Sequence, residues 1–380
     1  MDAMRWMTGL TLGGVGLLGG CLQAKAHDCG NGMYCPANLV CVDAEPFCAD
    51  PDELAACAGV VDDVECSTDL TPKGVCTAEA CMPCKPEDLR CRYWTWTAMA
   101  SPTTETLRGI WAAGPKDIYA VGDAGIVIHY DGVAWTKVAT QFLTRTLYEI
   151  WGSGPSDIYV LGGTQVFHYT GAWPSAAEDL STAAQIFAIS GSSANHVVAV
   201  GAAGVIRRFT GASPWTGMPS STAGTALYAA WGTSATDFYA AGDAVYHLDG
   251  AGWTVSTSLA GATGATINAM AGTSGGAVFA VGYEVPAGTF VPFAVKRAGT
   301  MWVPQAVPAG IGNEQLFGVW AAAADNAFAV GTGGLIVHHD GSSWEPTRLG
   351  TTLNAITGTS SGDVFAVGEN GLIWRYSYAP

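Results

Sequence analysis

Residues 117–122 read Asp-Ile-Tyr-Ala-Val-Gly, and six variants of this segment follow along the chain. Each is an apolar run ending in glycine, and the seven runs end at Gly122, Gly162, Gly201, Gly242, Gly282, Gly331 and Gly368. Successive glycines are 40, 39, 41, 40, 49 and 37 residues apart. Seven copies at a period near 40 residues indicate a repeat architecture.

Each repeat carries signals for four short strands. A strand such as residues 147–152 precedes the apolar run, a third strand such as residues 126–130 follows it, and a tight Gly turn leads into a fourth. The fourth strand begins at a tryptophan in six repeats: Trp135, Trp173, Trp215, Trp253, Trp302 and Trp344. Four short strands of β-branched and aromatic residues, separated by Gly turns, describe one blade of a β-propeller.

The seventh repeat ends at Pro380 without its tryptophan-led strand. A matching strand, Trp94-Thr-Trp96-Thr-Ala-Met99, stands just before the first repeat. We therefore expect an all-β, seven-bladed propeller over residues 93–380, closed by this N-terminal strand, because closure removes the open sheet edge.

The turns between the third and fourth strands carry a second pattern. Asp131-Gly, Asp249-Gly and Asp340-Gly resemble the Asp-box turn of sialidase-like propellers, whereas the other four repeats have Thr170, Thr210, Ala298 or Ser377. The whole repeat resembles the seven-bladed photosystem II assembly-factor propellers and the propellers of bacterial surface lipoproteins. The resemblance implies a fold that serves hydrolases, lyases, adhesins and assembly factors alike, so it specifies no function.

The first residues are typical of an exported protein. An uncharged run from Trp6 to Gly20 follows Arg5 and is too short to span a bilayer. Leu18-Gly-Gly-Cys21 resembles a bacterial lipobox, which implies that residues 1–20 are a lipoprotein signal peptide and that Cys21 carries the lipid. The alternative is an ordinary secretion signal, with Cys21 a thiol of the folded protein.

Residues 21–92 form the second predicted domain, a small cysteine-rich module. Ten cysteines remain after Cys21, an even number suited to five disulfides of open pairing: Cys29, Cys35, Cys41, Cys48, Cys57, Cys66, Cys76, Cys81, Cys84 and Cys91. Zinc is the competing interpretation for Cys81-Met-Pro-Cys84, but a second C-x₂-C pair is missing. Residues 28–41 resemble Dickkopf-type modules and residues 57–84 resemble myxobacterial surface proteins, which implies an extracellular location.

Composition excludes several classes of function. Charged residues make up 13% of the chain and the net charge is −16, which argues against a coiled coil and against nucleic acid as a partner. The sequence carries no P-loop, no G-x-S-x-G and no H-E-x-x-H, and the propeller has no cysteine. We expect no cofactor and assign no catalytic or metal-ligating residue.

A basic or imidazole side chain stands on the third strand of every repeat: His129, His168, Arg208, His247, Lys296, His338 and Arg375. Third strands lie about 10 Å outside the first. Neighbouring members are then about 9 Å apart or more, whereas two ligands of one zinc are at most about 4 Å apart. We expect a repeated polar contact instead, to the turn Asp or across a tryptophan face.

The first strand of six repeats has a small residue at the same position, which we expect to lie near the axis: Gly109, Ala188, Ala229, Ala269, Gly318 and Ala355. Glu149 breaks this pattern and is a candidate ligand or acid–base residue, or simply a solvated channel residue. No other repeat has a carboxylate at this place, so the pair needed for glycoside hydrolysis is not evident. Arg108 is the one arginine expected on a first strand.

The fifth repeat is longer than the others by about nine residues. We expect the insertion at residues 283–293 to present Tyr283, Glu284, Phe290 and Phe293 for binding, because irregular loops on rigid scaffolds carry function; it could also only cover its own apolar patch. The sequence favours a monomeric, outer-membrane or cell-surface lipoprotein that binds an unknown protein or glycan. The alternative is a carbohydrate-active hydrolase or lyase acting at the propeller axis.

Overall fold

The computed structural model divides the chain into two compact units, residues 1–93 and 94–379, which are considered separately. It describes residues 27–28, 34–35, 40–41, 48–49, 51–58, 65–66, 74–77, 80–83 and 94–378, except 143–144, 220–223, 251, 257–263, 274–275 and 309–312. Among these residues, no helix is long and apolar enough to cross a membrane. The predicted signal peptide and Cys21 lie outside them.

The first unit contains short antiparallel pairs and one helix. The pairs are β1 (His27–Asp28) with β2 (Tyr34–Cys35), and β3 (Val40–Cys41) with β4 (Cys48–Ala49); a three-stranded sheet has β5 (Glu65–Cys66), β6 (Gly74–Thr77) and β7 (Ala80–Pro83). Helix α1 covers Pro51–Cys57. Cys57 is fully buried and disulfide-bonded. The other cysteine side chains lie outside the described part, so their disulfides remain predictions.

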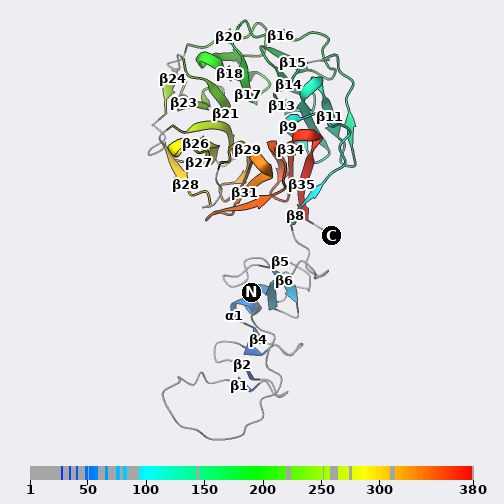
Figure 1. Cartoon of the computed structure of the whole chain (residues 1–380), viewed down its shortest axis with the longest axis vertical. Coiled ribbons are helices and arrows are strands. Elements are labelled where there is room, and N and C mark those ends of the chain that lie inside the picture. The colour runs from blue at the N-terminus through cyan, green and yellow to red at the C-terminus, as the bar shows by residue number, and fades with distance from the viewer. Residues whose placement is uncertain are drawn as a thin grey trace. The chain divides into compact units, whose positions relative to one another are not determined.

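The second unit is an all-β, seven-bladed propeller, as the repeats predict (Figure 1). Each blade is a four-stranded antiparallel sheet. The first three are β9 (Leu107–Gly114), β10 (Asp117–Gly122), β11 (Val127–Tyr130), β12 (Trp135–Lys137); β13 (Glu149–Gly154), β14 (Asp157–Gly162), β15 (Gln165–Tyr169), β16 (Glu178–Asp179); and β17 (Ile186–Ser193), β18 (His196–Gly201), β19 (Ile206–Phe209), β20 (Thr216–Gly217).

The next three sheets repeat the same order. They are β21 (Leu227–Ser234), β22 (Asp237–Gly242), β23 (Val245–Leu248), β24 (Trp253–Val255); β25 (Thr266–Gly272), β26 (Val278–Glu284), β27 (Val291–Ala298), β28 (Met301–Gln305); and β29 (Leu316–Ala323), β30 (Asn326–Gly331), β31 (Leu335–His339), β32 (Trp344–Arg348). Five turns between second and third strands contain a 3₁₀ turn: η1 (Asp123–Gly125), η2 (Ala202–Gly204), η3 (Pro286–Gly288), η4 (Thr332–Gly334) and η5 (Glu369–Gly371).

The seventh sheet joins the two ends of the repeat region. Its strands are β33 (Leu353–Ser360), β34 (Asp363–Gly368), β35 (Ile373–Tyr378) and β8 (Trp94–Ala98). β8 pairs antiparallel with β35, with Trp374 opposite Ala98 and Tyr376 opposite Trp96. The outer strand of the last blade is thus the segment that precedes the first blade.

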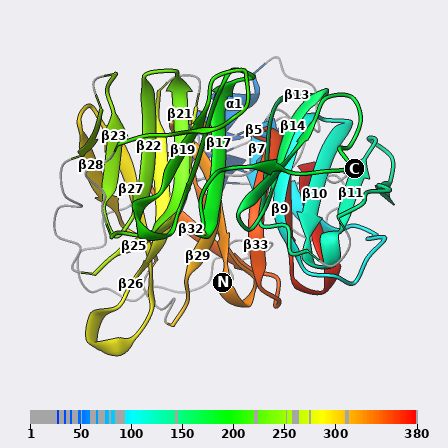
Figure 2. The same cartoon turned by 90° about the horizontal axis from the view of Figure 1, so that it is seen from above.

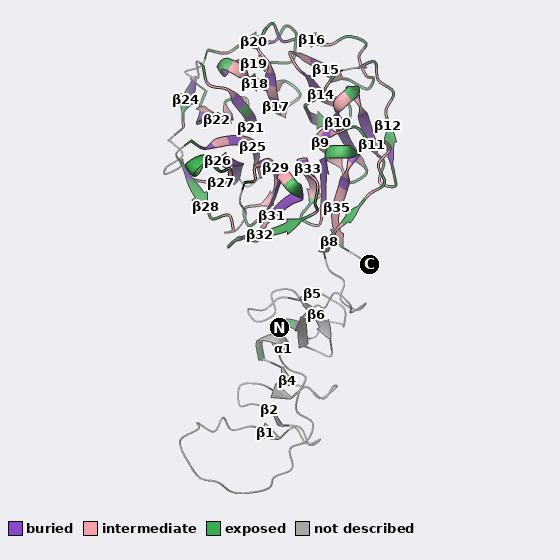
Figure 3. Cartoon of the chain, in the orientation of Figure 1, coloured by how far each residue is buried: buried purple, intermediate pink, exposed green. Residues whose placement is uncertain are grey.

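The core lies between neighbouring blades. Second strands are buried along nearly their whole length, and Figure 3 shows buried residues within every sheet of the ring. One apolar cluster joins Leu107 and Ile118 of the first blade to Phe365 and Val367 of the seventh. Each hydrophobic cluster therefore ties two blades together, and the ring has to form for any blade to bury its faces.

The Trp-Gly pattern of the first strands has a packing cause. A Cβ added to Gly152 would lie 2.7 Å from the indole of Trp111 in the preceding blade, and Gly191 meets Trp151 in the same way at 2.4 Å. The relationship recurs between Trp231 and Gly272, and between Trp320 and Gly358. A glycine is needed wherever the preceding blade places a tryptophan against this part of the strand.

Candidate functional site

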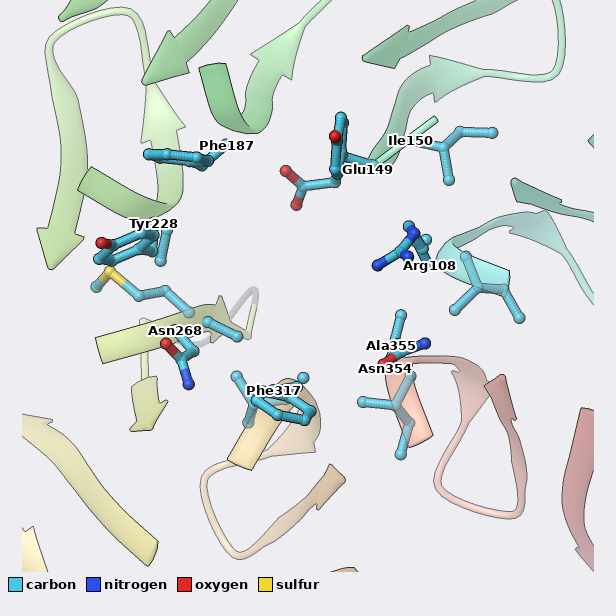
Figure 4. Close-up of a pocket in the computed structure, with 18 of the residues that line it drawn as sticks. Arg108, Glu149, Ile150, Phe187, Tyr228, Asn268, Phe317, Asn354 and Ala355 are labelled. Atoms are coloured by element: carbon cyan, nitrogen blue, oxygen red, sulfur yellow. The ribbon is translucent and has the colours of Figure 1, made fainter. Parts of the chain in front are cut away.

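A cavity of about 190 Å³ lies among the first strands of all seven blades (Figure 4). Each blade contributes the residue that follows a fully buried Leu or Ile at the start of its first strand. These seven residues, termed the mouth ring, are Arg108, Tyr148, Phe187, Tyr228, Asn268, Phe317 and Asn354. The buried position before them hardly varies, whereas the mouth ring differs from blade to blade.

The next position along the strands is small, as the sequence predicts, because neighbouring first strands approach closely. A Cβ added to Gly109 would lie 2.9 Å from the Cα of Glu149, and one added to Gly318 would lie 3.1 Å from the Cα of Ala355. The following position lines the cavity with buried apolar side chains: Ile110, Ile150, Ala230, Met270, Val319 and Ile356.

Glu149 lies at the small position of the second blade, and its carboxylate points into the cavity in Figure 4. The backbone N–H of Ile189, on the first strand of the third blade, donates to its Oε2 at 2.7 Å. Burial raises the pKa of Glu149 to about 8, and the Ile189 hydrogen bond offsets only part of that rise. This carboxylate is therefore held mostly protonated at neutral pH.

The guanidinium of Arg108 is paired with a carboxylate of its own blade. Its Nε and Nη2 donate to the two carboxylate oxygens of Asp123 at 2.7 and 2.9 Å, forming a bidentate pair. The hydrogen bonds from Arg108 lower the pKa of Asp123. Because Asp123 begins the turn after β10, this pair ties the start of the first strand to that turn.

Aromatic rings and amides complete the mouth ring. Tyr148 and Tyr228 are 39% and 36% exposed, and Phe187 packs against Tyr228 with ring centroids 5.0 Å apart. Asn268 and Asn354 donate from Nδ2 to the backbone carbonyl oxygen of the next blade's first strand, at 2.8 Å in both cases. The cavity therefore combines aromatic surface with a few fixed polar groups, as ligand sites usually do.

The cavity offers little for acid–base or nucleophilic catalysis. Among the described residues that line it, Glu149 is the one carboxylate, and none carries a thiol, an imidazole or an amine. The described part of the chain contains no group of three or more His, Cys, Asp or Glu side chains placed to hold a metal ion. The arrangement fits binding better than a reaction that needs paired carboxylates.

Four of the basic third-strand residues make the same contact within their own blades, whereas Arg208 and Lys296 donate to the backbone carbonyls of Ala235 and Ala324 in the next blade. His129, His168 and His247 bond through Nε2 to Asp117, Asp157 and Asp237 at 2.7, 2.6 and 2.7 Å, and Arg375 bonds to Asp363 at 2.8 Å. The expected partner was wrong in detail: the Asp begins the second strand and is not the turn Asp. Six of the seven also face a second-strand aromatic and not a tryptophan; the ring centroids of His168 and Tyr159, for example, are 4.0 Å apart. Arg208 lies opposite Val198 instead.

Serine or threonine completes some of these contacts without forming a catalytic relay. Ser153 donates to Asp157 and Thr233 donates to Asp237, on the side opposite the histidine. The carboxylate lies between the hydroxyl and the imidazole, whereas a nucleophile needs the imidazole between them. These groups stabilise the blade.

The turn Asp residues are structural as well. Asp131 Oδ1 accepts from the N–H groups of Val133 and Ala134, and Asp340 Oδ1 accepts from those of Ser342 and Ser343, at 2.8 to 2.9 Å. The N–H donors lower the pKa of both carboxyls. These Asp-box turns cap the ends of the third and fourth strands.

The fifth-blade insertion is a long hairpin between β26 and β27, and it projects beyond the neighbouring turns in Figure 2. Tyr283 and Phe290 are partly exposed and meet edge to face at 5.1 Å; Glu284 ends β26. The expectation that Phe293 is exposed was wrong: it is 6% exposed and packs in the core between the fourth and fifth blades. Strand β27 alternates its faces, and Phe293 points inward.

The mouth ring is the feature that the sequence did not reveal. The signal for it is a position that varies among the seven repeats. It follows the Leu or Ile at the start of each first strand and precedes the small residue. The hairpin lies at the same ends of the strands, because Tyr283 pairs with Thr266, two residues before Asn268. The insertion and the cavity mouth therefore share one face of the propeller.

The fold is that of a large class of seven-bladed propellers. No protein-family model and no curated protein sequence matches the chain. The structure of YCF48 bound to D1 peptide is similar at a TM-score of 0.56 and 13% identity, covering 75% of this chain and 94% of that one. The WD40 propeller of Doa1 has a TM-score of 0.58 and 12% identity, covering 74% and 97%.

An enzyme shares the architecture too. Virginiamycin B lyase from Staphylococcus aureus has a TM-score of 0.63 and 11% identity, covering 75% of this chain and 99% of the lyase. Identities this low establish the propeller fold alone. The function has to come from the site.

Proposed function

We propose that this protein is a lipid-anchored binding protein of the cell envelope, whose propeller holds a ligand at the mouth of the axial cavity. One observation carries the proposal: seven equivalent positions, on an otherwise uniform repeat, hold seven side chains chosen from Arg, Tyr, Phe and Asn around one cavity. Packing alone does not require such variety at positions that are exposed or partly exposed, whereas recognition of a ligand does.

A protein ligand is favoured over a glycan. The similar YCF48 structure contains a bound peptide, which supports a peptide-binding role for the same architecture. The hairpin at residues 283–293 adds partly exposed aromatic side chains at the face where the cavity opens. Aromatic anchors beside a pocket are typical of protein interfaces.

Capture from an envelope extract by the detergent-solubilised full chain tests the binding role. We expect the wild type and the Val133→Ala control to retain the same partner, because Val133 is an exposed residue of a turn between third and fourth strands. The double variant Tyr228→Ala, Phe317→Ala should lose it. A partner that survives the double variant, or the absence of any partner together with no hit on a glycan array, would overturn the proposal.

The lipid anchor rests on Leu18-Gly-Gly-Cys21 and has its own test. The Cys21→Ser variant should leave the membrane fraction and lack the diacylglycerol label that the wild type carries. Equal membrane retention of the two proteins would contradict the anchor and leave the ligand site unaffected.

A further inference from the structure

Several hydrogen-bond donors of the mouth ring are already used within the protein. Arg108 is engaged by both carboxylate oxygens of Asp123. The amide nitrogens of Asn268 and Asn354 point to backbone carbonyls, which fixes the orientation of each amide because a carbonyl oxygen can only accept. Both amides lie at the edge of the cavity in Figure 4.

For a cation, the cavity offers the carboxyl group of Glu149 and aromatic ring faces. Glu149 presents a carboxyl group of which Oε2 alone accepts a hydrogen bond from the described residues, so Oε1 can accept from a ligand cation once the group is ionised. Aromatic rings stand at four of the seven mouth positions: Tyr148, Phe187, Tyr228 and Phe317. Acceptors and aromatic faces together attract a cation that carries N–H donors.

The turns of the surrounding face carry acidic side chains. The seven turns between second and third strands carry Asp123, Asp243, Glu284 and Glu369 but no Lys or Arg. The propeller as a whole holds ten basic and eighteen acidic residues. The same face also carries Arg108, Arg145 and Arg348, and two of these arginines pair with carboxylates there. The attraction of a basic partner therefore comes from the net negative charge of the propeller.

We propose that the axial cavity takes the side-chain ammonium of a lysine presented by a protein partner, with Glu149 as its counter-ion. The inference rests on the proposed binding function and names its ligand chemistry. Glu149 lies one position deeper than the mouth ring, so the four-carbon stem of lysine passes the aromatic rings before the ammonium reaches the carboxylate. The ammonium of lysine is a compact charge that one carboxylate oxygen can pair with, and Oε1 accepts no hydrogen bond from the described residues.

The pairing couples binding to protonation. An ammonium beside Glu149 favours its ionised form, which burial disfavours in the empty cavity. Binding at pH 7 should therefore release close to one proton from the protein. Calorimetry in two buffers of different ionisation enthalpy measures that release directly.

The test titrates the full chain with acetylated, amidated Gly-Gly-X-Gly-Gly peptides in which X is lysine, norleucine, glutamine or arginine. We expect the lysine peptide to bind at least about tenfold more tightly than the norleucine and glutamine peptides, and more tightly than the arginine peptide. Glu149→Gln should abolish both the preference and the proton release, while its amide oxygen still accepts from Ile189. Glu345→Gln, an equal charge change on β32, should keep both.

A second variant keeps the experiment informative if one substitution disturbs the fold. Phe187→Leu should weaken lysine binding about two- to fivefold and leave the norleucine peptide nearly unaffected. Equal binding of lysine and norleucine, a preference for arginine, a preference that persists in Glu149→Gln, or no binding of any peptide would overturn the inference. A partner captured equally well by wild type and Glu149→Gln would leave the proposed binding function standing and remove the lysine alone.

Discussion

The backbone N–H of Ile189 donates a hydrogen bond to the carboxylate of Glu149 across two blades, at 2.7 Å. This contact joins the first strands of the second and third blades and holds the acidic side chain beside buried apolar residues of the cavity. One hydrogen bond compensates only part of the lost hydration, so the pKa of Glu149 is raised to about 8. Ionising Glu149 in the empty cavity therefore costs free energy, and a cationic ligand would offset that cost.

The first prediction concerns stability against pH. An acid whose pKa is higher in the folded than in the unfolded state binds more protons when folded, so stability falls as pH rises from about 4.5 to 8. Glu149→Gln removes this loss. Between pH 5 and pH 8.5, we expect the free energy of unfolding of the variant to rise relative to that of the wild type by about 2 kcal/mol. This change is smaller than the full ~1.4 kcal/mol per pKa unit, because water reaches the cavity.

Urea unfolding of both proteins at pH 5, 7 and 8.5 measures this difference. Glu345→Gln, on the surface, serves as the control and should show no such trend. A stability difference between Glu149→Gln and wild type that stays constant across pH would show that the carboxyl is well solvated in the folded protein.

The fold was predictable from sequence because its information is repeated. Seven Gly-terminated runs and six fourth-strand tryptophans report the same blade, so errors at single positions average out. The mouth ring was not predicted, because its position recurs in every repeat but its residue type does not. The site emerges only when the ring brings residues as distant as Arg108 and Asn354 to one cavity. The prediction for Phe293 was wrong for a related reason. The insertion lengthens strands β26 and β27, and the pleat of the strand decides which aromatic side chain faces inward.

The second prediction concerns His168. Burial lowers its pKa, but hydrogen bonds with Glu178 and Asp157 outweigh burial and raise it above the ordinary 6.5. A base whose pKa is higher when folded stabilises the protein fully below the unfolded value, and that stability is lost as pH rises through the folded value. We expect His168→Gln to cost about 1 kcal/mol more at pH 5.5 than at pH 9 in urea unfolding.

Blade seven provides a matched comparison, because Arg375 occupies the same place and bonds to Asp363. Arginine does not titrate in this range. The cost of Arg375→Gln should therefore be the same at both pH values. An equal cost of His168→Gln at pH 5.5 and pH 9 would contradict the charged pair.

The third prediction tests the close approach of neighbouring first strands. Gly109→Ala places a methyl group 2.9 Å from the Cα of Glu149, and backbone cannot move aside as a flexible side chain can. We expect a loss of about 1–3 kcal/mol, the usual cost of overpacking. The control is Gly154→Ala, where nothing lies within 4 Å, and it should be neutral or slightly stabilising. Similar stability of the two variants in urea would show that the strands can separate without cost.

The fourth prediction separates structure from binding on the fifth-blade hairpin. Phe293 is 6% exposed and belongs to the core cluster that contains Val245 and Trp302, so Phe293→Ala should lower the free energy of unfolding by about 3 kcal/mol. Phe290 touches Tyr283 edge to face at the partly exposed end of the hairpin, and Phe290→Ala should cost less than about 1 kcal/mol.

The same pair of variants should behave oppositely in partner capture. Phe290→Ala should weaken capture at unchanged stability, because Phe290 is available to a ligand while Phe293 is occupied by the core. Phe293→Ala should retain the partner below its lowered melting temperature, since its effect is on unfolding and not on the contact surface. Normal capture by Phe290→Ala would restrict the ligand to the axial cavity, whereas a small stability loss in Phe293→Ala would contradict the burial of this side chain between two blades.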